Sequence, residues 1–370
     1  MKLSEYLDYD LLCKHVNARV VNVQHHRFLP LAIYNYGQKA TFDGIWDDVT
    51  EKCRGLIVDQ STDQIIERPF RKFFNLNTDF RPETKVENLP TSQPEILDKL
   101  DGSLGILYRY NGCRGIATRG SFESDQAAWA SAWYEKHLGS AVWPVEYTPL
   151  FEIIYADNRV VVKYDYEGLV LLGAVHRETG AELPHVELFK LATLNGCRLA
   201  SRFHKTVSEC SCEDAPNLEG YVASWHYPDK PSLKVKIKFA EYCRLHHLIT
   251  GISPKEIWRM LTAGETFDEL TTNVPTHYAD WVNAWKASLE SEYGRIEQKA
   301  KAIYATCPLP KDGANKDLRK ALAEFFTLGD RKQVSGVLFK MLDGQPYDDA
   351  IWKMVRPMTA GLDPFRRENE

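Results

Sequence analysis

The residues that could do chemistry begin with a lysine that precedes an acidic residue and a glycine. Lys99-Leu100-Asp101-Gly102-Ser103 fits the pattern K-x-D-G, in which a lysine amine can act as a covalent nucleophile. With ordinary residue frequencies, a chain of this length shows the pattern by chance about one time in ten. A surface turn before a strand is the alternative interpretation, so the pattern needs support from other segments.

Other polar segments follow one another in a definite order around this lysine. The segments are Cys53-Arg54-Gly55, Arg68-Pro69-Phe70-Arg71-Lys72-Phe73-Phe74-Asn75, Thr118-Arg119-Gly120-Ser121, Phe151-Glu152, Glu219-Gly220-Tyr221-Val222 and Lys236-Ile237-Lys238. Taken together, they resemble the ATP-dependent RNA ligases of the T-even phage RNA ligase 1 type, within the wider superfamily of covalent nucleotidyltransferases. The resemblance runs from about residue 34 to residue 245, and the Lys-Phe-Phe-Asn sequence at 72–75 favours the RNA ligase branch.

This resemblance implies an activity and a set of site residues. Lys99 would attack ATP and become lysyl-AMP, AMP would pass to an RNA 5′-phosphate, and an RNA 3′-hydroxyl would then displace AMP. The implied substrate is RNA with these two ends, cleaved tRNA repaired during phage infection. Phe74 would lie near the adenine, and Arg119 stands where relatives carry lysine. The implied nucleotide-binding residues are Tyr34, Arg54, Lys72, Phe74, Asp101, Gly102, Arg119, Glu152, Glu219, Lys236 and Lys238.

The residue types suit nucleotidyl transfer on chemical grounds as well. A lysine amine attacks phosphorus only when neutral, yet at pH 7 about one free lysine in 2,500 is neutral. Nearby Lys236, Lys238 and Arg54 would disfavour the Lys99 cation and would also offset phosphate charge. Mg²⁺, which Mn²⁺ could replace, favours few carboxylates together with substrate phosphates, and Glu152 and Glu219 are the expected ligands.

Each of these residues also has an ordinary structural interpretation. Arg54, Lys72, Glu152 and Glu219 could each form a salt bridge on a strand face, and Tyr34 and Phe74 could be core residues. The ordered set makes the functional interpretation the stronger one for the charged residues.

The elements that must position these residues are short β-type runs with turns. Asn111-Gly112 between two such runs is a strong hairpin signal. One helix is expected at about 124–138, and the absence of regular helical crossovers favours antiparallel α+β over a doubly wound fold. With the resemblance, residues 1–245 are expected to form an antiparallel-sheet nucleotidyltransferase domain of the ATP-grasp-like ligase kind. The expected strands are 55–59, 64–68, 104–110, 114–118, 150–155, 159–164, 169–175, 220–225 and 233–238.

Residues 246–370 are expected to form a small all-helical domain that helps to choose the RNA. Ser253-Pro254-Lys255-Glu256 is a helix-start signal and Gly264 a stop. Trp281, Trp285, Leu289, Tyr293, Ile296, Ala300 and Ile303 recur at helical spacing and predict an amphipathic helix. Further helices are expected at 318–328, 334–342 and 348–355.

Composition is that of an ordinary globular protein. The chain has 370 residues, 44% hydrophobic and 26% charged, with a formal net charge of −5, so the overall charge gives no sign of a nucleic-acid partner. Eight scattered cysteines indicate reduced thiols and a cytoplasmic location. We expect neither a signal peptide nor a membrane span. We also expect the protein to be a monomer.

Two rival functions remain open. An mRNA guanylyltransferase or a DNA ligase would share the lysine motif, but both normally append an OB-fold where this sequence predicts helices. A catalytically inactive RNA-binding protein is the other rival, which the presence of Lys99, Glu152, Glu219, Lys236 and Lys238 disfavours.

Overall fold

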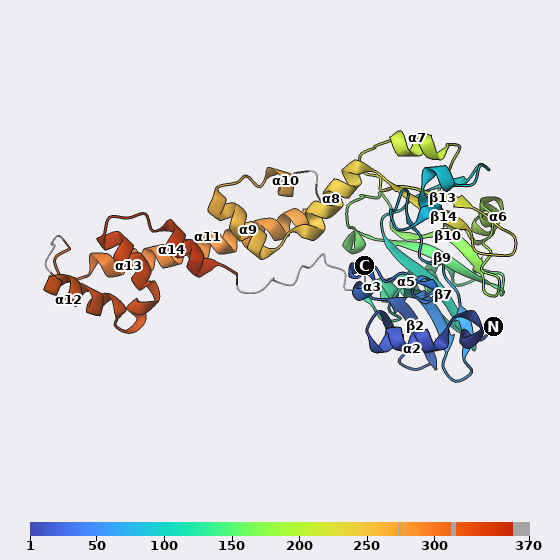
Figure 1. The fold of residues 1–370 in the computed structure, drawn as a ribbon, viewed down its shortest axis with the longest axis horizontal. Helices are drawn as coiled ribbons and strands as arrows, with labels where there is room; N and C mark the ends of the chain where they lie inside the picture. Colours follow the sequence, from blue (N-terminus) through green and yellow to red (C-terminus); the bar gives the residue numbers. More distant parts are fainter. Residues whose placement is uncertain (273, 275, 312–315, 358–370) are drawn as a thin grey trace. The chain divides into compact units, whose positions relative to one another are not determined.

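The computed structural model describes residues 1–272, 274, 276–311 and 316–357. The described residues divide into two compact units, one of Met1–His246 and one that begins at His247. In Figure 1 the first unit runs from blue to yellow and carries the strands. Mixed α and β structure agrees with the predicted α+β class.

A four-stranded antiparallel sheet forms the N-terminal part of the first unit. Its order is β1-β2-β3-β4. The β3–β4 hairpin was predicted, whereas β1 and β2 were not. Because almost every residue of β2 is buried, this strand lacks the alternation that marks a half-exposed strand. The strands are β1 (Val21–His25), β2 (Leu31–Tyr36), β3 (Arg54–Asp59) and β4 (Gln64–Glu67).

A five-stranded sheet in the order β11-β10-β9-β7-β8 forms the centre of the unit. The predicted hairpin around Asn111-Gly112 is confirmed, and both turn residues have positive φ, at 48° and 82°. All pairs are antiparallel except β10 with the edge strand β11. The strands are β7 (Ser103–Tyr110), β8 (Cys113–Thr118), β9 (Tyr147–Ile154), β10 (Gly168–His176) and β11 (Arg198–Leu199).

The third sheet has the order β12-β6-β13-β14-β5. Its pairs are antiparallel except for β14 with β5. Strands β13 and β14 were predicted, and the short strands β5, β6 and β12 were not. The strands are β5 (Phe74–Asn75), β6 (Glu95–Asp98), β12 (Arg202–Phe203), β13 (Gly220–Trp225) and β14 (Leu233–Lys238).

Helices cover the sheets of the first unit. Helix α5 was predicted, and its N-cap Ser124 accepts a hydrogen bond from the Ala127 amide. Tyr134 of α5 and Leu188 of α6 pack with Phe151 on one face of the central sheet. The helices, with 3₁₀ turns marked η, are α1 (Leu3–Tyr6), α2 (Tyr9–Asn17), α3 (Gln38–Phe42), α4 (Asp48–Lys52), η1 (Pro82–Thr84), η2 (Val86–Asn88), α5 (Asp125–Leu138), η3 (Ala156–Asn158), α6 (His185–Asn195), α7 (Val207–Cys212) and α8 (Ala240–Gly251).

The other face of the central sheet packs on the N-terminal sheet. Ile106 and Leu150 contact the cluster that contains Leu31 and Ile33. The carboxylate of Glu67 ties the two sheets together: it accepts a hydrogen bond from the Thr148 hydroxyl at 2.6 Å and forms ion pairs with Arg109 and Arg177 at 3.4 and 3.3 Å. Glu67 is fully buried, so these partners compensate the cost of burying its charge.

One predicted strand is absent. Residues 159–164 form a loop, because the amides of Val161 and Val162 donate to the Asp101 carboxylate and not to a neighbouring strand.

The described residues of the second unit form helices and no strand. The predicted signals for α9 are confirmed: Ser253 accepts a hydrogen bond from the Glu256 amide, and Gly264 ends the helix with φ of 66°. The long predicted helix is α11, whose Leu289, Ile296 and Ala300 are buried. The elements are α9 (Pro254–Ala263), α10 (Asp268–Thr271), α11 (Thr276–Ala305), α12 (Lys316–Thr327), η4 (Gly329–Val334), α13 (Ser335–Leu342) and α14 (Asp348–Val355).

Within the described ranges, no helix has both the length and the apolar character needed to cross a bilayer.

The buried Glu67 network generates a stability prediction. Replacing Glu67 with alanine leaves two arginines without their shared carboxylate, so we expect the free energy of unfolding to fall by about 3–5 kcal/mol. Urea denaturation of both proteins measures the difference. Glu187→Ala, which removes an exposed ion pair within α6, is the control and should change stability by less than about 0.5 kcal/mol. Equal effects of the two substitutions would contradict the role of Glu67.

Candidate active site

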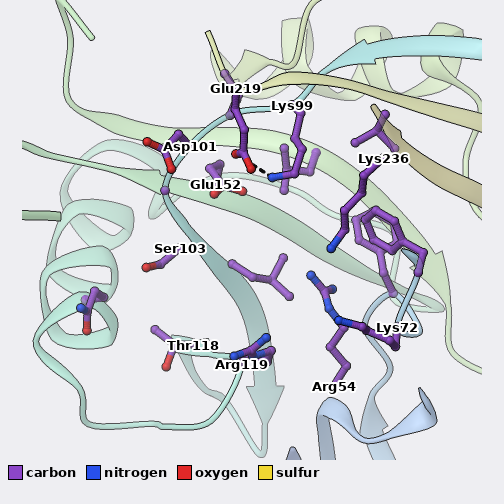
Figure 2. A pocket seen from close by; sticks show the side chains of 18 of the residues that line it. Arg54, Lys72, Lys99, Asp101, Ser103, Thr118, Arg119, Glu152, Glu219 and Lys236 are labelled. Carbon is purple, nitrogen blue, oxygen red and sulfur yellow. Dashed lines mark ion pairs between the residues drawn. The ribbon is translucent and has the colours of Figure 1, made fainter. Parts of the chain in front are cut away.

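A cavity of about 720 Å³ in the first unit collects most of the predicted site residues. Figure 2 shows Lys99, Glu219 and Glu152 at one end and Arg54, Lys72 and Arg119 at the other. Ten of the twelve predicted residues line the cavity, and Tyr34 and Phe74 do not. The ten are Arg54, Lys72, Lys99, Asp101, Gly102, Arg119, Glu152, Glu219, Lys236 and Lys238.

Strand geometry explains how distant residues meet here. Lys234, Lys236 and Lys238 alternate along β14 and therefore point to one face, where all three line the cavity. Lys99 follows β6, and its amide donates to the Gly220 carbonyl at 3.0 Å, so the nucleophile segment continues the pairing with β13. This register brings Lys99 beside Glu219, the residue that precedes β13.

Two glycines permit the close packing of this region. A Cβ on Gly102 would lie 2.6 Å from the Ile153 carbonyl oxygen and 2.9 Å from Glu152 Cγ. Gly220 has φ of 137°, and a Cβ there would lie 2.0 Å from the Ile237 carbonyl oxygen. Larger residues would therefore push Lys99 away from Glu152 and Glu219.

The amine of Lys99 is paired with a carboxylate. Its Nζ lies 2.6 Å from Glu219 Oε2, and Lys238 Nζ lies 2.9 Å from Glu219 Oε1. Burial lowers the pKa of Lys99, but Glu219 and Glu152 outweigh burial and raise the pKa above its ordinary value. The expectation that burial and the neighbouring cations would disfavour the Lys99 cation overall is therefore wrong, because the Glu219 carboxylate is in direct contact with the amine.

Lys236 has the opposite electrostatic environment. Burial, followed by the charges of Lys72, Lys99 and Arg54, lowers the pKa of Lys236 well below its ordinary value. The Lys236 amine lies 4.9 Å from the centre of the Phe73 ring. A bound anion would relieve this crowding of positive charge.

Asp101 holds the loops around the nucleophile. Its Oδ2 accepts from the amides of Val161 and Val162 at 2.9 Å each, and its Oδ1 accepts from the Tyr242 hydroxyl at 2.9 Å. The Asp101 amide in turn donates to the Tyr164 hydroxyl at 2.7 Å. The carboxylate thus has three donors from the protein itself, and a contact of Asp101 with a nucleotide stays a prediction.

Three cations surround the phenol of Tyr36 at the other end of the cavity. Arg119 Nη1 donates to the Tyr36 hydroxyl at 2.7 Å, and Lys72 Nζ donates at 3.4 Å. Burial raises the pKa of Tyr36, but Arg119, Lys72 and Arg54 outweigh burial and lower the pKa to about 8. Arg54 Nη1 is buried and has no hydrogen-bond partner among the described residues, which leaves a donor free for an anion.

Two predicted nucleotide-pocket residues are replaced by their neighbours. Tyr34 packs against the core cluster of Leu56 and Val58, and Tyr36 on the same strand lines the cavity instead. Phe74 packs edge-on against Trp46 and Phe80, and Phe73 lines the cavity in its place. Spacing by two along β2 could have pointed to Tyr36, but nothing in the sequence separates Phe73 from Phe74.

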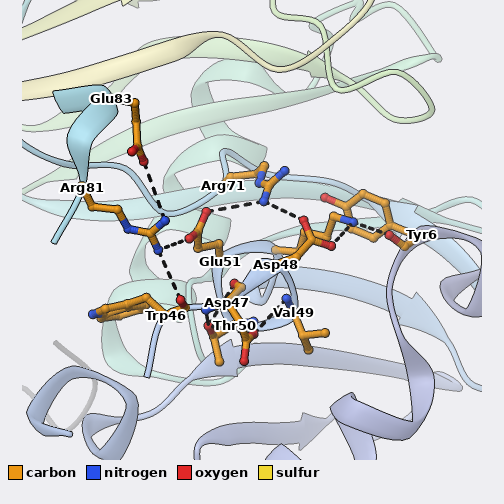
Figure 3. A network of polar contacts seen from close by, with 11 residues as sticks. Tyr6, Trp46, Asp47, Asp48, Val49, Thr50, Glu51, Arg71, Arg81 and Glu83 are labelled. Carbon is orange, nitrogen blue, oxygen red and sulfur yellow. Dashed lines mark hydrogen bonds and ion pairs between the residues drawn. The ribbon is translucent and has the colours of Figure 1, made fainter. Parts of the chain in front are cut away.

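A polar network fixes the segment that carries Lys72 and Phe73. In Figure 3, Glu51 of α4 pairs with both Arg81 and Arg71, and Arg71 also contacts Asp48 at 2.9 Å. The Lys72 amide donates to the Glu51 carbonyl at 2.9 Å. Because α4 directly precedes Arg54 on β3, one helix positions both cations.

Sequence analysis also missed two residues next to the nucleophile. Asp98 lines the cavity, and burial followed by the charge of Glu219 raises its pKa to about 6. Tyr242 of α8 lines the cavity and bonds Asp101. No short pattern marks either residue, because their roles arise from contacts between distant segments.

Comparison with known proteins identifies the family. A sequence model of the family described as RNA ligase, of the T4 RNA ligase 1 type, matches residues 52–242. This chain belongs to that RNA ligase family. The matched range contains the cavity residues Arg54, Lys99, Glu219 and Lys238.

Three curated proteins that are similar in sequence to this RNA ligase family member are themselves named as RNA ligases. A putative RNA ligase of Thermovibrio ammonificans is 30% identical over 225 residues, covering 59% of this chain and 58% of the relative. An RNA ligase of Rhodothermus phage RM378 is 23% identical over 345 residues, covering 73% and 78%. A putative bifunctional polynucleotide kinase/RNA ligase of Autographa californica nuclear polyhedrosis virus is 27% identical, and the match covers 39% of its length. The chain thus spans less than two thirds of the first and third of these relatives.

Solved structures that match this family member are more distant. An archaeal ATP-dependent RNA ligase has 15% identity and a TM-score of 0.44, with 92% of this chain and all of that chain covered. A variant of the Naegleria gruberi RNA ligase, solved with ATP and manganese, has 16% identity and a TM-score of 0.31, with 41% and 51% covered.

The environment of Tyr36 leads to a spectroscopic prediction. We expect one tyrosine to ionise near pH 8, because three cations stabilise its phenolate, whereas exposed tyrosines ionise near pH 10. A pH titration of tyrosinate absorbance in the wild type and in Tyr36→Phe measures this, and the difference between the curves should have its midpoint near 8. Tyr9→Phe, at an exposed position, is the matched control. A difference curve centred at pH 10 would contradict the described geometry.

Proposed function

We propose that this protein is an ATP-dependent RNA ligase that joins RNA 5′-phosphate and 3′-hydroxyl ends. The observation that carries the proposal is the position of Lys99 in a cavity with carboxylates at one end and cations, including the unpaired Nη1 of Arg54, at the other. Nucleotidyl transfer through a lysine adduct uses an amine together with groups that bind metal and groups that bind polyphosphate.

In the first step, Lys99 Nζ loses a proton and attacks the α-phosphorus of ATP. A bond forms between nitrogen and phosphorus, and the bond to the bridging oxygen of pyrophosphate breaks. Because Glu219 holds the Lys99 amine as a cation, this pair must separate before the amine can attack. Arg54, Lys72 and Lys236 are the proposed partners of the β- and γ-phosphates.

Glu152 and Glu219 are the proposed ligands of Mg²⁺ or Mn²⁺. The described residues contain no cluster of three or more acidic, cysteine or histidine side chains that could hold a metal alone. Two buried carboxylates fit Mg²⁺, which binds through one or two carboxylates together with substrate phosphates. When bound, the metal would neutralise phosphate charge and compete with Lys99 for Glu219.

The next two transfers would use the same cavity. The phosphoramidate bond of lysyl-AMP breaks as an oxygen of the RNA 5′-phosphate attacks, and the Lys99 amine leaves. The RNA 3′-hydroxyl then loses its proton and displaces AMP to form the phosphodiester. The finer assignment, repair of cleaved tRNA during phage infection, rests on the resemblance to the phage enzymes. We propose that the helical second unit contributes to the choice of RNA, and that the protein acts as a cytoplasmic monomer.

The proposal predicts a covalent adduct on Lys99. Incubation with labelled ATP and a divalent metal, followed by a denaturing gel, should show an AMP adduct on the wild type. Lys99→Ala should show none, and Lys99→Arg should also fail because arginine stays protonated. Lys230→Ala, an exposed lysine, is the control and should label normally. Labelling by GTP would indicate a guanylyltransferase, and no label at all would indicate an inactive RNA-binding protein.

The Lys99–Glu219 pair predicts a pH dependence. Protonated Lys99 is inactive, so adduct formation should rise with pH, and Glu219→Gln should move this rise to lower pH because the raised pKa of Lys99 falls. Loss of a metal ligand should also lower the maximal rate at least about 100-fold. Single-turnover rates across a pH series measure both effects, with Glu241→Gln as an exposed control. An unchanged pH profile would contradict the pairing.

The proposed binding of metal by Glu152 predicts that this residue is needed for RNA sealing. Glu152→Ala should reduce sealing of RNA at least about 100-fold through lost transition-state stabilisation. Sealing is measured over a range of Mg²⁺ and Mn²⁺ concentrations, with thermal melting to check the fold. Full activity of Glu152→Ala at every metal concentration would contradict the role of Glu152 as a metal ligand.

The role of the second unit is tested by truncation. A fragment of residues 1–251, which retains α8, contains every cavity residue and should still form lysyl-AMP. Its sealing of a structured RNA, such as a tRNA cleaved in the anticodon loop, should fall more steeply than its sealing of unstructured RNA, because recognition of RNA shape needs a second surface. Equal losses of sealing activity on both RNAs would indicate that the second unit supports the structure and does not select the RNA.

A further inference from the structure

Beyond the cavity, an arginine and a tyrosine stack at the edge of the central sheet. The guanidinium carbon of Arg198 lies 4.2 Å from the centre of the Tyr166 ring. Arg198 is exposed and Tyr166 is half-buried, and the ion pairs found among the described residues do not include Arg198. Neither residue lines the cavity, and neither belongs to the predicted site.

Strand register places Arg198 on the same face of the central sheet as Glu152. Leu104 pairs with Glu152, Glu152 pairs with Val170, and Val170 pairs with Arg198, so these residues form one row across β7, β9, β10 and β11. Directly paired residues share a face, and Arg198 therefore lies two strand spacings, about 10 Å, from Glu152 in the backbone.

The stack is continuous with the floor of the cavity. Tyr166 packs on a cluster that includes Leu100 and Ala200, and both of these residues line the cavity. The segment after Arg198 runs past the nucleophile, because the Asp98 amide donates to the Ser201 carbonyl at 2.9 Å. A ligand that enters the cavity from this edge of the sheet would pass over the Arg198–Tyr166 pair.

The chemistry of the pair selects a nucleotide of a single strand. A planar guanidinium over a phenol ring offers a flat surface on which a base can stack, and the arginine edge can donate to a phosphate. Acidic residues flank the ring: Asp165 is exposed, and Glu167 accepts from the Ala156 amide at 2.9 Å. Because these carboxylates weaken attraction for phosphate alone, stacking must supply much of the binding.

We propose that Arg198 and Tyr166 form a stacking platform for a nucleotide of the single-stranded RNA whose end reacts at Lys99. This inference rests on the proposed ligase function and adds a substrate subsite outside the nucleotide cavity. The platform contacts an unpaired base close to the reacting end and holds the strand while AMP is transferred.

The main test is RNA binding without ATP. Fluorescence anisotropy with a short, 5′-phosphorylated single-stranded RNA should show about tenfold weaker binding for Arg198→Ala and for Tyr166→Ala. Tyr166→Phe keeps the ring and should bind like the wild type. Arg198→Ala should also reduce the slope of binding against salt by about one phosphate contact, and Arg198→Lys should restore the slope but not the full affinity. Lys190→Ala, which removes an exposed cation of α6 with the same change in net charge, should have little effect.

Stacking is tested directly with modified RNA. Placing an abasic nucleotide at successive positions near the end should weaken binding by the wild type at one position. The same RNA should cause no further loss in Arg198→Ala, because the guanidinium on which the base stacks is already missing. If the losses of affinity from the abasic nucleotide and from the substitution add at every position, the proposed stacking platform is wrong.

The outcome for the platform can be separated from the outcome for the ligase activity. Both alanine variants should form lysyl-AMP at the wild-type rate and show a raised KM for RNA with little change in kcat. If the wild type forms no AMP adduct, the proposed function fails. If the adduct forms normally but Arg198→Ala binds RNA as Lys190→Ala does, the pair only covers the sheet edge and the inference is overturned.

Discussion

The contact between the Lys99 amine and the Glu219 carboxylate is the interaction on which the site depends. A buried lysine that stood alone would lose its proton, whereas a buried lysine 2.6 Å from a carboxylate keeps it. Glu219 therefore holds the Lys99 amine as a cation. The same contact gives a buried glutamate its counter-ion, and Lys238 completes the balance on its other oxygen.

The surrounding fold maintains this contact by close packing of backbone segments. Gly102 lets the segment after Lys99 approach β9, and Gly220 lets β13 approach β14, more closely than a side chain would permit. Asp101 then uses its buried carboxylate to fix the 160–162 loop and α8 around the lysine. An acidic residue two positions after the nucleophile thus acts as a structural organiser of the site, which is a different use of charge from that of Glu152 and Glu219.

Charge is divided along the cavity, and this division suits a polyphosphate. Carboxylates gather near Lys99, and cations gather near Tyr36 and the unpaired Arg54 donor. The phenol of Tyr36 accepts hydrogen bonds from Arg119 and Lys72, and these cations lower its pKa to about 8. A phosphate chain would offset the cations at one end, and a bound metal would offset the carboxylates at the other.

The sequence by itself determined the order of the chemical segments, the strands with clear alternation and turn signals, and the helix caps of the second unit. The Asn111-Gly112 turn and the Ser253 and Gly264 caps are local, so a few residues suffice to specify them. Tertiary structure decided the features that depend on contacts between distant segments. It placed Tyr36 and Phe73 in the cavity in place of Tyr34 and Phe74, made 159–164 a loop that Asp101 holds, and raised the pKa of Lys99 where neighbouring cations suggested the reverse. The physical reason is that burial, strand register and the distance between charges are set by the packing of remote elements, whereas residue types and turn chemistry are written in adjacent positions.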